Sequence, residues 1–411
     1  MNVLSLLTTK NAQNTLIPER LAPALDYIAA YWSLLLRRKS QDEGTLVGLP
    51  HPYLVPAHDE LAPFNFNELY YWDSYFMVQS MLSQECRQFV AGILDDLITL
   101  YQRFGIIPNA SRTYLTGRSQ PPLLTSLIFD VYNIGGFDLE WLQSRLAVAE
   151  SEYRHVWMND KKPHWRRVYR GLSRYYDINM LHDLAEAESG WDMTSRFNRQ
   201  CLNYLPVDLN SLLYKYETDF AKLAELVRRP DEAAKWRRRA EERRAAMHEL
   251  MWDETRDFFY DYNFKKQRLG RVSSLAGYYT MWAGLASEQQ AAKMVKTLRR
   301  FEHRGGLACT DRPLPALPIG MPVQWAYPNG WAPLHFIVVE GLRRYGYEAE
   351  ARRIARKWLA VNLSWFEKYG VFLEKYNVVS PDKPPVSGLY PCQTGFGWTN
   401  AVFERFARDW L

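Results

Sequence analysis

The segment that decides the fold class is Trp331-Ala-Pro-Leu-His-Phe-Ile-Val-Val-Glu-Gly-Leu-Arg-Arg344. It is strongly apolar, and its helical pattern stops before Gly346. A second helical pattern follows at once, over residues 348–369, and Gly370 stands where a helix C-cap glycine is expected. Two long helices in direct succession are typical of an all-α protein.

The same helical periodicity recurs along the chain, and it predicts further helices over residues 18–38, 229–252 and 288–301. Strand signals are few, and residues 257–263 with 270–273 are the one candidate hairpin. The loops between helices are long and combine Pro, Gly, Asn, Ser and Trp. Such loops inside a compact domain are usually functional. We therefore expect an all-α architecture with long, aromatic, polar-rich loops on one side.

Length and composition suit a soluble globular protein. With 411 residues, the chain could hold two or three domains. It has no Gly/Ser linker, no low-complexity run and no block of like charge, so we expect one domain over residues 1–411. Apolar residues make up 47% of the chain and charged residues 24%, which is normal for a globular protein with a large core.

Charge and aromatic content indicate which classes of partner the protein binds. The net charge of +5 is dispersed, and the densest basic run, Arg237 to Arg244, contains acids at helical spacing. This pattern indicates a solvated helix face, so we expect no nucleic-acid partner. The 15 Trp, 26 Tyr and 19 Phe make up 15% of the chain. They indicate either a large core or a pocket in which aromatic faces pack on sugars.

Cysteine spacing and the N-terminal segment bear on the cellular location. No CxxC or Cys/His cluster suggests zinc, and nothing requires disulfides among Cys86, Cys201, Cys309 and Cys392. The segment 1–7 has no basic region before it and is cut short by polar residues, so it is not a convincing signal peptide. No stretch approaches ~18 consecutive apolar residues, so we expect no membrane span and a cytoplasmic location.

Two distant segments each set one carboxylate beside aromatic residues: Glu188-Ser-Gly-Trp-Asp192 and Leu373-Glu-Lys-Tyr376. Cleavage of a glycosidic bond needs two carboxyls, one protonated to release the leaving oxygen and one ionised to activate water or attack carbon. Aromatic walls raise a carboxyl's pKa by desolvation and also stack on sugar rings. A single carboxylate of this kind is more often a surface or cap residue, so the assignment of a catalytic pair depends on the remaining segments of the sequence.

Further aromatic and amide-rich segments accompany these two in a fixed order: residues 66–76, 108–114, 117–122, 188–196, 324–333, 374–376 and 393–400. This succession resembles the trehalases of glycoside hydrolase family 37 in order and approximate spacing, over residues ~60–405. The resemblance implies an (α/α)6 barrel, or toroid, with long active-site loops on one face and the active site in a funnel at one end. It also implies an inverting mechanism without a metal or other cofactor.

The resemblance assigns the two catalytic roles. Asp192 corresponds to the general acid of the family and Glu374 to its general base. In an inverting enzyme the two carboxyls stand roughly 6.5–9.5 Å apart, which leaves room for the attacking water. Trp191 would help to keep Asp192 protonated, and an inward-pointing Lys375 would keep Glu374 ionised.

The resemblance also implies a set of substrate-binding residues. Asn, Arg and Asp side chains suit vicinal hydroxyls, because a sugar hydroxyl both donates and accepts hydrogen bonds. The residues that match the glucose subsite are Trp72, Asp73, Asn109, Arg118 and Gln120. Those that match the second family signature, or flank the two carboxyls, are Gln324, Trp325, Asn329, Trp331, Trp191 and Tyr376. For Asp73 a helix cap, for Asn329 a turn, and for Trp72 and Trp331 a core position remain alternative roles.

The chain departs from the family at four places. Asn65 stands where the family has Arg, Ala326 where it has Asp, and Leu389 where it has Glu. The family's Arg-Pro-Arg-Pro-Glu-Ser segment is missing, and residues 169–176 stand there instead. Several charged groups that would hold substrate hydroxyls are therefore absent, which predicts a different or smaller aglycone.

The departures favour a small compatible-solute α-glucoside, glucosylglycerol or glucosylglycerate, as the substrate. Glycerate would need a cation at the aglycone site, which Arg170 or Arg174 could supply. Trehalose is the main alternative substrate. A catalytically weak sugar-binding protein and another toroid enzyme, such as a phosphorylase, are the alternative functions. A small sugar is the only partner expected, and the sequence does not indicate the oligomeric state.

Overall fold

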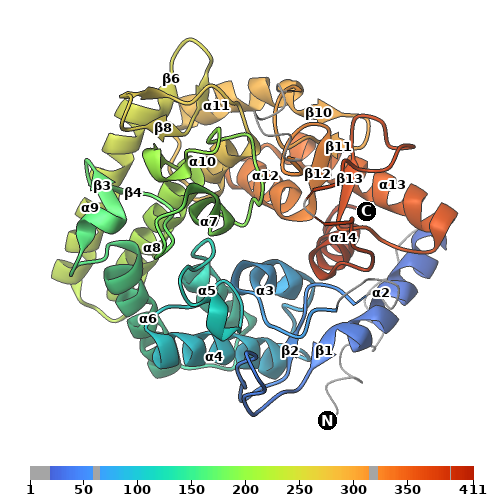
Figure 1. The fold of residues 1–411 in the computed structure, drawn as a ribbon, viewed down its shortest axis with the longest axis horizontal. Helices are drawn as coiled ribbons and strands as arrows, with labels where there is room; N and C mark the ends of the chain where they lie inside the picture. The colour runs from blue at the N-terminus through green and yellow to red at the C-terminus, as the bar shows by residue number, and fades with distance from the viewer. Residues whose placement is uncertain (1–18, 59–64, 314–322, 389) are drawn as a thin grey trace.

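The helices form two concentric rings in the computed structural model, which describes residues 19–58, 65–313, 323–388 and 390–411 (Figure 1). The inner ring consists of α3 (Tyr71–Met77), α5 (Leu124–Ile134), α8 (Val207–Leu226), α10 (Tyr279–Trp282), α12 (Ala332–Arg344) and α14 (Gly397–Trp410). The outer ring consists of α2 (Ala22–Leu35), α4 (Arg87–Phe104), α6 (Leu139–Glu152), α9 (Pro230–Met251), α11 (Glu288–Thr297) and α13 (Glu348–Tyr369). Inner and outer helices alternate along the chain. This arrangement is an (α/α)6 barrel, and it confirms the predicted all-α fold.

The residues of each ring reflect its surroundings. All seven residues of α3 are buried, as expected for an inner helix that is covered on every side. The outer helix α9 buries one stripe instead, in which Trp236, Ala240, Arg243 and Met247 recur every three or four residues. The other face of α9 is polar and meets water. The two kinds of helix therefore differ in how much of their surface is apolar.

The inner ring closes through contacts between successive helices and between its ends. Helix α14 packs on α3, which joins the last inner helix to the first. A buried hydrogen-bond cluster links α3 to α5 and α8: the Tyr71 hydroxyl lies 3.1 Å from the Tyr216 hydroxyl, and both accept from the backbone N–H of Leu124. The ring is thus held by polar as well as apolar contacts.

Helix ends follow the signals in the sequence. Helix α9 begins at Pro230, where the ring of proline suits the first turn. Helix α13 ends before Gly370, whose φ of +72° is a conformation that favours glycine. The helix predicted over residues 18–38 is α2 with a 3-10 turn at Glu19–Leu21 before it. The helices predicted from the sequence are therefore confirmed, with ends that shift by a few residues.

The strands are two or three residues long and form antiparallel pairs in the loops. They are β1 (Leu36–Arg37) with β2 (Tyr53–Leu54), β3 (Arg167–Tyr169) with β4 (Leu172–Ser173), β6 (Trp252–Asp253) with β7 (Phe258–Phe259), β10 (Glu302–His303) with β11 (Gly306–Leu307), and β12 (Asn329–Trp331) with β13 (Lys375–Asn377). The one three-stranded sheet of the described residues has the order β5 (Tyr204–Leu205), β8 (Tyr262–Asn263), β9 (Arg268–Leu269). The predicted hairpin corresponds to β8 and β9, so its second strand lies just before the expected residues.

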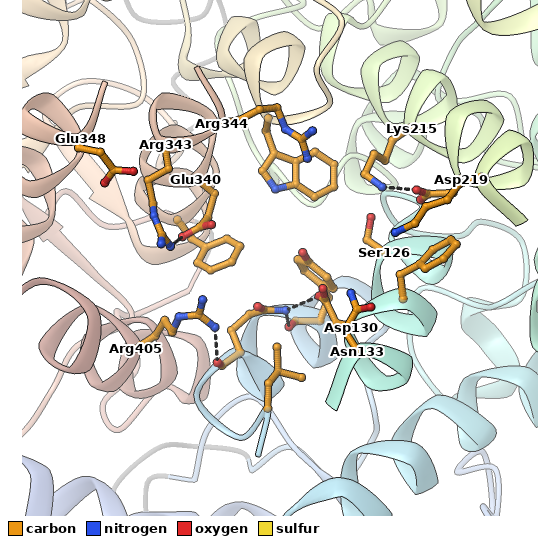
Figure 2. Close-up of a pocket in the computed structure, with 17 residues that line it drawn as sticks. Ser126, Asp130, Asn133, Lys215, Asp219, Glu340, Arg343, Arg344, Glu348 and Arg405 are labelled. Atoms are coloured by element: carbon orange, nitrogen blue, oxygen red, sulfur yellow. Dashed lines mark hydrogen bonds and ion pairs between the residues drawn. The ribbon is translucent and has the colours of Figure 1, made fainter. Parts of the chain in front are cut away.

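The inner helices run parallel, which gives the ring two different ends. Side chains at or before their N-terminal turns, such as Asp73 on α3 and Trp398 on α14, line a cavity of about 420 Å³ at what we call the N-terminal mouth. Each inner helix places a residue of its C-terminal half in a second cavity of about 600 Å³ at the opposite C-terminal mouth (Figure 2). These residues are Tyr75, Asn133, Lys222, Trp282, Arg344 and Arg405.

Helix length and polarity also bear on membrane insertion. Of the helices that the structure describes, none is both long enough and apolar enough to cross a bilayer.

Candidate active site

The N-terminal mouth gathers carboxyl groups within aromatic walls. Four acidic side chains line its cavity, namely Glu68, Asp73, Asp192 and Glu374. Eight aromatic side chains surround them: Phe66, Tyr70, Trp72, Tyr114, Trp325, Tyr390, Phe396 and Trp398. The two predicted catalytic carboxyls, which are 182 residues apart in the sequence, therefore face one cavity. Such a cavity offers rings for the apolar faces of sugars and carboxyls for their hydroxyls.

Asp192 lies on the loop that follows α7 (His182–Ala187), and Glu188 anchors this loop. The Glu188 carboxylate accepts two hydrogen bonds from Arg166, at 2.6 and 2.7 Å, and one each from the backbone N–H groups of Ser119 and Tyr176. All four acceptor positions of the carboxylate are thus in use. This side chain fixes the start of the loop that carries Asp192.

Gly190 brings the same loop against Trp72, which the resemblance matches to the glucose subsite. Its φ is +75°, and a Cβ at this position would stand 2.5 Å from the ring of Trp72. Only glycine allows so close an approach at this backbone conformation. The approach sets Asp192 beside Trp72 on the cavity wall.

The environment of Asp192 favours the protonated acid. Burial is the main cause that raises the pKa of this carboxyl to about 7, and the negative charge of Glu374 adds to the shift. The cations of Arg118 and Lys375 oppose the shift without cancelling it. A carboxyl with this pKa is about half protonated at neutral pH, which suits a general acid.

Glu374 is held by two donors. The ammonium of Lys375 lies 2.6 Å from Oε2, and the hydroxyl of Tyr390 donates to Oε1 at 2.9 Å. Lys375 is completely buried, with its Nζ 4.9 Å from the centre of the Trp331 ring. The inward orientation that the sequence left open is therefore the one observed. The lysine supplies a counter-charge next to the carboxylate while leaving further lone pairs of both oxygens available for a water molecule.

Asp73 adds a third carboxyl close to the pair. It lies in the first turn of α3, where Tyr70 and not Asp73 is the N-cap residue. Its pKa lies well above the usual range because of burial and, to a smaller extent, the charges of Asp192 and Glu374. A protonated Asp73 can donate a hydrogen bond as well as accept one, as a sugar hydroxyl requires.

The other residues matched to the glucose subsite also line the cavity. They differ in how fully their side chains are hydrogen-bonded within the protein. The Gln120 side chain accepts from the N–H of Trp72 at 2.9 Å, so it holds the start of α3. The Asn109 amide donates weakly to the carbonyls of Ser119 and Ala187, at 3.3 and 3.4 Å. Arg118 pairs with Asp177 at 3.2 Å, and its Nε has no hydrogen-bond partner. Arg118 is thus the member of this group best able to bind a ligand.

Of the residues matched to the second signature, Trp325 alone lines the cavity, and the others support it from behind. Trp331 stacks on Trp325 with ring centroids 3.7 Å apart and 5° between the planes. The Gln324 amide donates to the carbonyl of Asp192, and Asn329 in turn donates to the carbonyls of Gln324 and Val386. The alternative role of Trp331 as a core residue agrees with these contacts, whereas Asn329 is the first residue of strand β12 and not a turn residue.

The two residues that flank the catalytic carboxyls also lie behind the cavity wall. Trp191 is buried between Trp325 and the guanidinium of Arg196, which stands 4.5 Å from the centre of its ring. The hydroxyl of Tyr376 accepts from the N–H of Leu373 at 2.9 Å. Both side chains shape the loops that carry Asp192 and Glu374, and neither lines the cavity.

Of the residues predicted to set specificity, the four that the structure describes do not line the cavity. Arg170 is exposed and pairs with Glu249, and Arg174 donates to the carbonyls of Trp165 and Leu202. Neither guanidinium reaches the cavity. Asn65 and Ala326 are likewise absent from the lining, and Leu389 lies outside the described residues.

Two residues of the site escaped the sequence reasoning. Tyr390 follows directly after the departure at Leu389, and its contact with Glu374 depends on a loop that no local pattern predicts. Glu68 belongs to the first aromatic segment and could have been found as a carboxylate among aromatic residues. Its charge is balanced by Arg112 at 2.9 Å. In the described part of the chain, no three His, Cys, Asp or Glu side chains gather as metal ligands would.

Comparison with known proteins gives consistent results. A family model described as trehalase matches residues 12–181 and 176–409. The cytosolic neutral trehalase of Kluyveromyces lactis is 33% identical over 88% of this chain and 56% of its own length. The periplasmic trehalase of Xanthomonas axonopodis pv. citri is 34% identical over 92% of this chain and 72% of its own length. The chain thus spans little more than half of the Kluyveromyces protein.

Solved structures agree with the sequence comparison. The neutral trehalase of Saccharomyces cerevisiae superposes with a TM-score of 0.75 at 31% identity, over 86% of this chain and 72% of the yeast chain. The residues that the family model matches include both helical rings and the loops of the N-terminal mouth. The chain belongs to the trehalase family.

Proposed function

We propose that this protein is an inverting glycoside hydrolase that cleaves trehalose into two glucose molecules. The observation that carries the proposal is the pair of carboxyls in one aromatic cavity. Asp192 has a pKa of about 7, while Glu374 is paired with the buried ammonium of Lys375. One carboxyl is thus suited to give a proton and the other to accept one, which is the division of labour that inversion requires.

The reaction follows from these roles. Asp192 donates its proton to the glycosidic oxygen as the bond to the anomeric carbon breaks. Glu374 accepts a proton from a water molecule whose oxygen attacks the anomeric carbon on the opposite face. The products are one glucose with inverted configuration and one released from the aglycone side. Asp192 ends ionised and Glu374 protonated, and proton exchange with solvent restores both.

Family membership favours trehalose over the smaller glucosides that the sequence favoured. The argument for glycerol or glycerate depended on missing charged groups and on a cation from Arg170 or Arg174. Both arginines use their guanidinium groups elsewhere, and Ala326 is absent from the cavity lining. The volume of about 420 Å³ is within the usual range of small-molecule sites. Relatives at 33 and 34% identity are named as trehalases.

Substrate profiling tests the proposal. Purified protein is incubated with trehalose, glucosylglycerol and glucosylglycerate, and glucose release is followed in parallel with Asp192→Asn as the control. We expect release from trehalose to be fastest, and proton NMR to detect the inverted anomer before mutarotation. Faster release from either glycerol-type glucoside would replace trehalose as the substrate, and retained configuration would refute the inverting mechanism. Sugar binding without release would identify a binding protein.

We also propose a cytoplasmic location. The four cysteines are free thiols in the structure, three of them buried, which suits a reducing compartment. Relatives carry both cytosolic and periplasmic names, so fractionation of cells that express the native gene is the deciding measurement. Recovery in a periplasmic extract would overturn this location.

A further inference from the structure

A third cavity, of about 430 Å³, lies on the outside of the barrel, between the β3–β4 hairpin and the outer helix α9 (Figure 1). It is separate from both mouths of the inner ring, because it shares no lining residue with either. Six cationic side chains line it, namely Arg167, Arg170, Lys235, Arg238, Arg239 and Arg243, against the two carboxylates Glu217 and Glu242. The lining thus has a net charge of +4, while the whole chain has +5.

The floor of this cavity is electrically balanced. Glu217 and Arg243 are buried there, with the Nε and Nη2 of Arg243 within 3.0 Å of the carboxylate. The Tyr153 hydroxyl also donates to Glu217, and the remaining Nη1 of Arg243 donates to Asn210. The pair is fully hydrogen-bonded, so it forms a rigid base and leaves the positive charge at the rim.

Three of the five cations at the rim have no ion-pair partner among the described residues. Arg170 pairs with Glu249, which is outside the cavity, and Arg239 stands 3.8 Å from the already neutralised Glu217. Arg167, Lys235 and Arg238 have no ion-pair partner among the described residues. Lys235, Arg238 and Arg239 are three and four residues apart on α9, so they share one face of the helix, where like charges repel. This face is therefore less stable alone than with an anion bound.

The acids of α9 and its neighbours compensate other arginines instead. The sequence predicts that residues 237–244 form a solvated face in which acids offset the bases. In the structure Glu225 pairs with Arg237, and Glu241 pairs with Arg244. Neither of these arginines lines the cavity. On the cavity side of α9, Glu242 stands against Lys235, Arg238 and Arg239, so this side keeps a net positive charge.

We propose that this cavity binds the phosphate group of a small phosphorylated metabolite. A phosphate ester carries nearly two negative charges and three acceptor oxygens, which three uncompensated cations can match. Guanidinium groups bind phosphate oxygens in pairs, and two of the three cations are arginines. The concave shape and the volume suit a small molecule, whereas a nucleic acid would need a longer basic surface. The proposal does not depend on the reaction at the N-terminal mouth.

Calorimetric titration of the full chain tests the proposal, with inorganic phosphate, pyrophosphate and glucose 6-phosphate as probes at physiological salt. The cavity variant is Lys235→Gln with Arg238→Gln. Its matched control is Arg229→Gln with Arg237→Gln, which removes the same charge from exposed positions of the same helix region outside the cavity. We expect one binding site, weakened about tenfold or more in the cavity variant and unchanged in the control. Pyrophosphate should also raise the melting temperature of the wild type.

Several results would overturn the proposal. No heat of binding with any probe, or equal weakening in both double variants, would mean that the cavity is not a phosphate site. A DNA duplex or an anionic lipid vesicle that binds through Lys235 and Arg238, with no binding of the three probes, would replace it with a macromolecular surface. If the cavity variant fails to fold, the single variant Arg167→Gln on the hairpin applies the same test, with the same expected weakening.

Discussion

The two mouths of the inner ring are built from opposite ends of the same six helices, yet only one is suited to chemistry. The C-terminal mouth has the larger cavity, about 600 Å³ against about 420 Å³. Two of its acids, however, are paired side by side with bases: Asp219 with Lys215 and Glu340 with Arg343 (Figure 2). At the N-terminal mouth Asp73 and Asp192 lie near Glu374 without a pairing cation of their own, and their pKa values rise. The C-terminal mouth also holds one carboxyl of raised pKa, Asp130, so cavity size and a single such group are poor guides to function, and several carboxyls gathered within aromatic walls are a better one.

Helix polarity explains part of this difference. The carbonyl ends of the inner helices carry partial negative charge, and basic residues such as Arg343, Arg344 and Arg408 occupy the last turns of α12 and α14. These bases stabilise the C-terminal ends of the helices. At the other mouth the helix N-termini present partial positive charge, which favours anions. The pKa of Asp192 nevertheless rises, so burial outweighs the helix ends there.

The largest expected effect comes from removing either carboxyl of the pair. Asp192→Asn and Glu374→Gln should each lower kcat for trehalose by about 10²- to 10⁴-fold, because proton transfer by a positioned group contributes that much. Steady-state kinetics measures the loss. Asp192→Asn should melt no earlier than the wild type, since an amide avoids a buried charge. Near-normal turnover in either variant would remove that residue from the catalytic pair.

The pH dependence should report the acid of the pair. As the proposed general acid, Asp192 must be protonated to act, and its pKa is about 7, so kcat/KM should be maintained below that pH and fall about tenfold per pH unit above it. A series of rate measurements from pH 5 to 9, within the range where the protein stays folded, checks the slope. An unchanged kcat/KM up to pH 9 would contradict the assignment of Asp192 as the acid.

Tyr390 should have an intermediate effect, because it positions the base. Its hydroxyl donates to Glu374 at 2.9 Å, and a hydrogen bond to a charged group contributes about 1.5–3 kcal/mol. Tyr390→Phe should therefore lower kcat about tenfold or more and change KM little. Tyr114→Phe is the matched control, because Tyr114 lines the same cavity but is largely exposed. Equal effects of the two substitutions would exclude a positioning role for the Tyr390 hydroxyl.

The smallest effect on activity is expected at the C-terminal mouth, with Asp130→Asn. Burial raises the pKa of Asp130 to about 6, so its ionised form destabilises the fold at neutral pH. The asparagine should increase the free energy of unfolding by about 1 kcal/mol above pH 6, a value reduced by partial exposure. The increase should be much smaller at pH 4, where the folded carboxyl is protonated and the unfolded one is only about half ionised.

Denaturant titration of Asp130→Asn at pH 4 and pH 7.5 measures this difference, and kcat should stay within about twofold of the wild type. A large loss of activity in this variant would show that the two mouths are not independent, and the contrast between them would fail.

Much of the fold could be predicted from the sequence because its signals are local. Pro230, Gly346 and Gly370 mark helix ends by their own backbone preferences. The toroid itself followed from the resemblance, because helical periodicity gives the number of helices more readily than their arrangement. The structure places the hairpin at residues 262–269, a few residues from its predicted position. Strands of two residues carry almost no periodic signal, so the sequence could not locate them more closely.

The site was harder to predict because its details depend on contacts between distant loops. Residues in one motif divide between the cavity wall and its support: Trp325 lines the cavity, while Trp331 stacks behind it. Their sequence context is nearly the same, so only the tertiary structure separates them. The sequence suggests Arg170 or Arg174 as a cation for the aglycone side, because both lie in the segment that replaces the family's Arg-Pro-Arg-Pro-Glu-Ser. Nearby acceptors, the Glu249 carboxylate and two backbone carbonyls, engage them instead.

The anchoring of Glu188 has a consequence for protein engineering. One carboxylate joins the acid loop to Arg166, to the segment of Ser119 and to Tyr176, so four stretches of chain meet at a single side chain. If the loop that carries Asp192 were transferred into a relative without these hydrogen-bond partners, Asp192 would lack the contacts that orient it. Loop exchange within the family should therefore transfer Glu188 and Arg166 as a unit.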